Sequence, residues 1–167
     1  MRRSCLYLIL LLIVISCRES TNEQQTSEEK KPVKIVEQKI LDSDYYISLP
    51  SDYTITESVG PDFVVYYFAS EDTTDTERFS GGFYEGYHPM RYTPEKDCQI
   101  TLQEAQFLGE EIEWTITKCK DTYTIQTYVG EQEEGEMNLI IDAFGMAKST
   151  EELNRLLKAY TTLREER

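Results

Sequence analysis

The side chains that most often carry out chemistry are scarce in this chain of 167 residues. It has a single histidine, His88, so a Ser-His-Asp triad or a two-histidine metal site would have to use this residue or be absent. His88 lies between Tyr87 and Pro89, where the following proline favours an extended backbone, as is typical of an exposed turn. We therefore expect no catalytic residue, no metal site and no cofactor.

Carboxylates are plentiful, and they leave two alternatives open. Two acids about 5 to 9 Å apart in a cleft could hydrolyse glycosidic bonds, as in an enzyme acting on cell-envelope glycans. The acids gather at expected turns, in residues 71–77, 110–113 and 131–136, which is typical of solvated loop tips. Residues 71–77 also offer oxygen ligands for calcium, but they lack the glycine and the spacing of a calcium-binding loop.

Residues 81–92 combine three glycines and a proline with several aromatic side chains. Tyr and Arg are enriched at interface hot spots, and a loop that can bend presents them well. The main alternative is a strand that ends in a turn, with Phe83 and alternate tyrosines in the core. Trp114, flanked by Ile112 and Ile116 on one strand face, is expected in the core. The residues that we expect to contact a partner are Tyr84, Tyr87, His88, Arg91 and Tyr92.

The formal net charge of −14 restricts the class of partner. Nucleic acids and anionic lipid surfaces are bound through Lys and Arg, so neither suits this chain. A negative field attracts cationic partners and speeds their encounter, which favours a basic protein or peptide. Solubility alone is the simpler explanation of the charge.

The N-terminal residues have the layout of a secretory signal. Arg2 and Arg3 precede an apolar stretch over residues 6–15, which is shorter than the ~20 residues needed to span a bilayer. A transmembrane segment is the less favoured alternative. Removal of residues 1–16 would take away two basic residues and no acid, leaving 15 basic against 31 acidic side chains and a charge of −16.

Residues 14–17, Val-Ile-Ser-Cys, resemble the lipobox of bacterial lipoproteins, in which a cysteine becomes the lipidated first residue. This resemblance implies that Cys17 is acylated and anchors the chain in a membrane, since several acyl chains hold a protein durably. The alternative is a secreted protein with Cys17 as a free thiol. In the usual Gram-negative sorting rule, an aspartate after the lipidated cysteine retains a lipoprotein in the inner membrane. Because Arg18 occupies that position, we expect this chain in the outer membrane of the cell envelope, facing the periplasm or the cell surface.

Residues 17–33 hold almost no apolar side chains and are expected to form a flexible tether, whereas residues 34–167 suit one domain. The domain is rich in Tyr, Ile, Val and Thr and predicts nine strands. Ser149, with an acid three residues later and leucines at helical spacing, predicts a C-terminal amphipathic helix. The expected fold class is α+β, a twisted antiparallel sheet packed by that helix. The nine strands are expected at residues 34–41, 45–49, 53–58, 63–69, 78–86, 99–107, 112–118, 122–129 and 136–144.

Two strands, at residues 63–68 and 139–144, are apolar almost throughout, which is typical of strands covered on both faces. The C-terminal helix can cover only one face of the sheet. We therefore expect the other face to be covered by the N-terminal hairpin, by a short helix at residues 101–106, or by a partner. The pattern resembles the PsbP-like sandwich of small lipoproteins, through residues 47–53, residues 82–89, the hairpin from Leu108 to Trp114 and the terminal helix. This resemblance implies a protein-binding role, and some similar lipoproteins are immunity proteins against secreted toxins.

Cysteine usage agrees with export. Cys5 leaves with the signal and Cys17 takes lipid, so Cys98 and Cys119 remain to form a disulfide. A symmetric loop centred between Leu108 and Gly109 would place the two cysteines directly opposite each other on adjacent strands, within the span of a disulfide. The same register would partly cover both faces of the hairpin.

Overall fold

We describe a computed structural model of the chain over residues 33–72, 74–75, 78–130 and 138–166. These residues belong to one compact unit, Pro32–Arg167. Cys17, the expected signal and the expected tether up to residue 32 lie outside the described residues. Among the described residues, no helix is long and apolar enough to cross a membrane. The elements are β1 (Ile35–Lys39), β2 (Tyr45–Pro50), β3 (Tyr53–Val59), β4 (Phe63–Ser70), β5 (Ser80–Gly86), β6 (Gln99–Phe107), β7 (Glu110–Cys119), β8 (Thr122–Val129), β9 (Ile140–Ala147), α1 (Thr150–Tyr160) and β10 (Arg164–Glu165).

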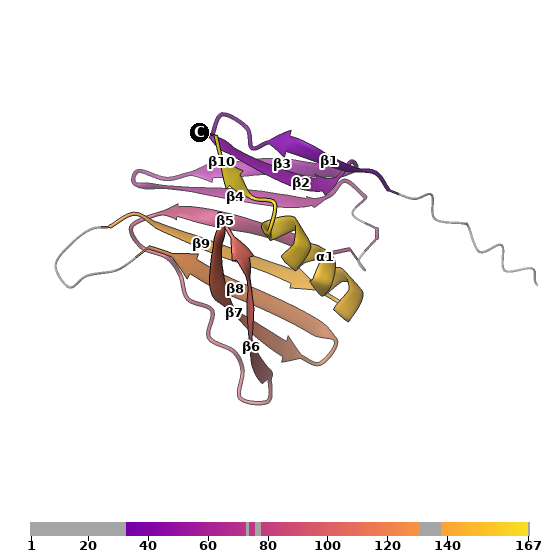
Figure 1. Cartoon of the computed structure of the whole chain (residues 1–167). Helices are drawn as coiled ribbons and strands as arrows, with labels where there is room; N and C mark the ends of the chain where they lie inside the picture. The colour runs from indigo at the N-terminus through magenta and orange to yellow at the C-terminus, as the bar shows by residue number, and fades with distance from the viewer. Residues whose placement is uncertain (1–32, 73, 76–77, 131–137, 167) are drawn as a thin grey trace, which may run out of the picture. The chain divides into compact units, whose positions relative to one another are not determined.

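The strands form two antiparallel sheets (Figure 1). The larger sheet has seven strands in the order β3-β4-β5-β9-β8-β7-β6, and the smaller has three in the order β1-β2-β10. With α1 as the one helix of the described residues, the α+β fold class expected from the sequence is confirmed.

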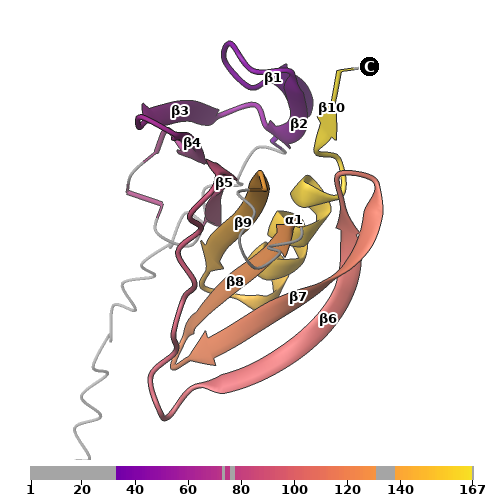
Figure 2. The same cartoon turned by 90° about the vertical axis from the view of Figure 1, so that its left-hand side faces the viewer.

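The core lies between the seven-stranded sheet and a layer made of α1 and the smaller sheet. Ile47 and Leu49 of β2 and Leu156 of α1 are fully buried in one hydrophobic cluster with Phe83 and Trp114 of the large sheet. The N-terminal hairpin therefore shares a face with α1, and the expectation that it covers the opposite face is wrong. Figure 2 shows α1 on one side of β8 and β9 and the connection between β5 and β6 on the other.

The C-terminal helix begins and packs as the sequence predicts. The side chain of Ser149 accepts a hydrogen bond from the backbone N–H of Glu152, which caps the first turn. At the other end, the hydroxyl of Tyr160 accepts a hydrogen bond from the N–H of Gly82 and lies 2.6 Å from the carbonyl oxygen of the same residue. Burial raises the pKa of Tyr160, so its hydroxyl stays protonated and holds the helix end on β5.

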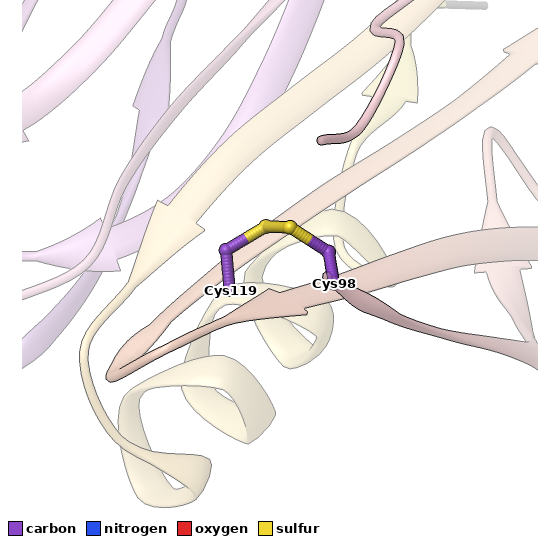
Figure 3. Close-up of a disulfide and its surroundings, with 2 residues drawn as sticks. All are labelled: Cys98 and Cys119. Carbon is purple, nitrogen blue, oxygen red and sulfur yellow. A yellow bond between two sulfur atoms is a disulfide. The ribbon is translucent and has the colours of Figure 1, made fainter. Parts of the chain in front are cut away.

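The β6–β7 hairpin has the register predicted from the cysteines. Leu108 and Gly109 have positive φ angles of 52° and 84° and form the two-residue turn between β6 and β7, and Phe107 faces Glu110 across them. Cys98 and Cys119 form a disulfide with their Cα atoms 4.6 Å apart (Figure 3). Because β6 is a continuous strand, the expected short helix at residues 101–106 is wrong.

The sequence misplaced some strand boundaries. β9 ends at Ala147 rather than at Phe144, and β5 begins at Ser80 rather than at Arg78. The part of the expected last strand at residues 136–137 lies outside the described residues. The two-residue strand β10 was not expected, since its pairing with Tyr45 and Tyr46 depends on where α1 ends.

Candidate functional site

The face of the seven-stranded sheet opposite α1, here called the outer face, carries the candidate site. The strand register aligns a row of side chains across it, because paired residues point to the same side of a sheet. This row runs through Tyr67, Gly82, Phe144, Gln126, Thr115 and Leu102. At Gly82 an added Cβ would collide with the carbonyl oxygen of Tyr66, and the bare backbone leaves room for the rings of Tyr67 and Phe144, 5.9 Å apart, to pack edge to face.

The connection between β5 and β6, residues 87–98, is here called the strap, and Gln126 binds it to the outer face. The side-chain oxygen of Gln126 accepts a hydrogen bond of 2.9 Å from the N–H of Tyr92. Its amide nitrogen donates to the carbonyl oxygen of Met90 at 2.9 Å. One side chain of β8 thus holds two backbone groups of the strap.

Asp142 lies beneath this attachment. Its carboxylate is 3% exposed and accepts hydrogen bonds from the amide nitrogen of Gln126, at 2.9 and 3.1 Å. Burial raises the pKa of Asp142 to about 6, against the opposing effects of the Gln126 hydrogen bond and the nearby Arg91 guanidinium. The guanidinium of Arg91 lies 5.0 Å from the ring centre of Tyr128, so the strap also contacts β8 through a cation–π interaction.

A pocket of about 720 Å³ opens beside the strap on the outer face. Its lining is largely apolar and includes one charged residue, Arg91, but no carboxylate. Four of its apolar or aromatic side chains are exposed, and these are Tyr67, Met90, Tyr92 and Met146. Exposed Met and Tyr of this kind form adaptable contact surfaces, which is typical of binding sites for protein segments.

The structure divides the expected partner-contacting residues into two groups. Arg91 and Tyr92 line the pocket. Tyr84 instead stacks on Phe63, with ring centres 5.6 Å apart, and its hydroxyl accepts a hydrogen bond from the N–H of His88. Tyr87 is half-buried and His88 exposed at the start of the strap, and neither lines the pocket.

The calcium alternative gains no geometric support. Among the described residues, no group of three or more His, Cys, Asp or Glu side chains is placed to hold a metal ion. In the expected calcium segment, the carboxylate of Asp72 already accepts hydrogen bonds from the backbone and hydroxyl of Thr74, while Glu77 lies outside the described residues.

Sequence reasoning missed most of the pocket. Its floor comes from β4, β5, β8 and β9, which only the strand order brings together. One signal of the neighbouring contact between Asp142 and Gln126 was present in the sequence. Asp142 interrupts the apolar run of residues 139–144, and a lone carboxylate in such a run needs a buried partner.

Comparisons with protein-family models, with curated proteins and with solved structures found no match to this chain.

Proposed function

We propose that this protein is a membrane-anchored, non-catalytic binding lipoprotein of the cell envelope, which holds a protein or peptide partner in the pocket beside the strap. The observation that carries the proposal is the pocket itself, whose exposed aromatic and methionine side chains surround a floor without a carboxylate. A site of this composition can bind apolar side chains, but it offers no acid–base pair for hydrolysis.

The charge of the chain indicates the class of partner. A formal charge of −14 favours a basic protein, and an immunity protein that neutralises a cationic secreted toxin is the most specific form of the proposal. The apolar pocket would supply contact area, while the surrounding acids would speed encounter. A PsbP-like relationship, which the sequence pattern suggests, would agree with a binding role and belongs to the same proposal.

The proposed location in the cell envelope depends on the N-terminal sequence. Cys17 would carry the lipid, and Arg18 at the following position favours the outer membrane. Labelling cells with a palmitate analogue should mark the natural chain and leave a Cys17→Ala variant unmarked. If both forms partition into the aqueous phase of a detergent extraction, the anchor is disproved.

Site-specific photo-crosslinking tests the pocket. A photoreactive residue placed at Tyr92 or at Met146 in the full-length chain should capture the same partner in intact cells, since both side chains line the pocket. The matched control is the same probe at Lys158, an exposed position on α1. Equal capture from Lys158, or capture of no common protein from the two pocket positions, would contradict the proposal.

A further inference from the structure

The free edge of the seven-stranded sheet at β6 provides a second surface, separate from the pocket. β6 ends the sheet, and among the described strands only β7 pairs with it. Ile100 and Leu102 on this strand are 54% and 56% exposed, although the hairpin register had suggested that both faces would be partly covered. A long edge strand with exposed apolar side chains is a template for pairing with another chain.

The disulfide identifies which backbone groups of β6 face the free edge. Cα atoms 4.6 Å apart, as in Cys98 and Cys119, are typical of a pair that exchanges no backbone hydrogen bonds. Because such pairs alternate with bonded ones, Ile100, Leu102 and Glu104 occupy the same kind of position. Their N–H and C=O groups therefore point away from β7, and their side chains lie on the outer face.

The charges on this part of the hairpin are unbalanced. Glu104 lies directly opposite Glu113, and Glu111 occupies the next position on the same face of β7. Opposed like charges destabilise a pair of strands. None of these three carboxylates forms an ion pair with another described residue. A cation from outside the domain would relieve the repulsion.

We propose that β6 accepts an extended segment of a basic partner protein as an additional antiparallel strand, with apolar residues beside Ile100 and Leu102 and a Lys or Arg beside Glu104. The segment's backbone satisfies the outward groups of β6, and alternate side chains select its sequence. A second copy of this chain suits the edge poorly, because each copy carries a charge of −14.

The edge at the other end of the sheet differs in chemistry and supplies controls. On β3, the outer-face side chains are Thr54, Thr56 and Ser58, which offer neither an apolar surface nor a charge. Val59 and Glu57 of β3 are exposed, as are Leu102 and Glu104 of β6. Val59→Thr and Glu57→Gln are therefore matched controls for Leu102→Thr and Glu104→Gln.

The probe is the peptide Lys-Thr-Lys-Thr-Val-Thr-Val, whose residues would lie opposite positions 106 to 100 in that order. Hydrogen exchange of the full-length chain in detergent, followed by mass spectrometry, should show protection of β6 and none of β3 or the pocket strands. Leu102→Thr and Glu104→Gln should each weaken binding about threefold, while the β3 controls leave it unchanged. Replacing both lysines of the peptide by glutamate should abolish protection.

Backbone pairing is tested by methylating the peptide nitrogens. The N–H groups of the second Lys and the first Val of the peptide would face β6, so methylating these two nitrogens should abolish protection. Methylating the nitrogen of the Thr that follows each of them should preserve protection, because those N–H groups would point away from β6. Three outcomes would each overturn the proposal. They are equal protection by the two methylated peptides, protection of the pocket strands instead of β6, and a dimer of the chain alone in which β6 is already protected. The pocket and the β6 edge lie on different strands, so a negative result for one proposal would not contradict the other.

Discussion

The side-chain amide of Gln126 on β8 lies 2.9 Å from the carboxylate of Asp142 on β9 and also holds the strap. A surface loop is thereby coupled to a carboxylate within the sheet. Since this one amide uses its oxygen and its nitrogen together, loss of the side chain removes both connections at once.

Gln126→Leu should therefore lower the free energy of unfolding by about 1 to 3 kcal/mol, because the buried Asp142 carboxylate loses its hydrogen bonds from the Gln126 amide. Hydrogen exchange at residues 90–93 should accelerate. Urea titration followed by fluorescence of Trp114, the single tryptophan, measures the first effect. Gln103→Leu, at an exposed position of β6, is the control, and an equal effect there would rule out the proposed connection.

Asp142 should make stability depend on pH. Its pKa of about 6 in the folded protein exceeds its ordinary value of 3.8, so the folded state retains a proton that the unfolded chain releases between these values. The free energy of unfolding should fall by about 2 kcal/mol as the pH rises from 4 to 7. The Asp142→Asn variant should lack this pH-dependent part of the stability. If the difference in unfolding free energy between the two proteins is the same at pH 4 and pH 7, the prediction is wrong.

Tyr92 and Tyr84 should respond differently to truncation. Tyr92→Ala should weaken partner binding by about 1 to 4 kcal/mol with little loss of stability, because its ring is 46% exposed beside the pocket. Tyr84→Ala should instead lower the thermal midpoint, since the ring stacks on Phe63. Paired crosslinking and melting experiments separate the two roles. The assignment fails if Tyr92→Ala unfolds the domain.

The disulfide should contribute about 3 kcal/mol to stability, as expected for closing a loop of about 20 residues. A Cys98→Ser, Cys119→Ser double variant should show this loss in urea. The reductant-treated natural protein should match the variant. Two free thiols in protein isolated from its natural host would show that the bond does not form there.

The sequence predicts what depends on local patterns. Ser149 and the leucines that follow it predict α1, and the two cysteines with Leu108 and Gly109 predict the register of β6 and β7. The pocket depends instead on β5 pairing with β9, across more than fifty residues of chain. Nothing near Gln126 in the sequence indicates that it holds Met90 and Tyr92, because those contacts exist only after the sheet has assembled.

The position of β1 has a mechanical consequence for an anchored protein. A pull on the N-terminal side of the domain would load Ile35 first, at the open end of the β1–β2 hairpin. There the strand pairs separate one after another instead of shearing together. β1 pairs only with β2 among the described strands, and the ion pair between Glu37 and Arg164 is exposed and weak. Under tension, β1 would therefore peel away before any force reached the seven-stranded sheet. If Cys17 anchors the chain as proposed, this step would lengthen its link to the membrane.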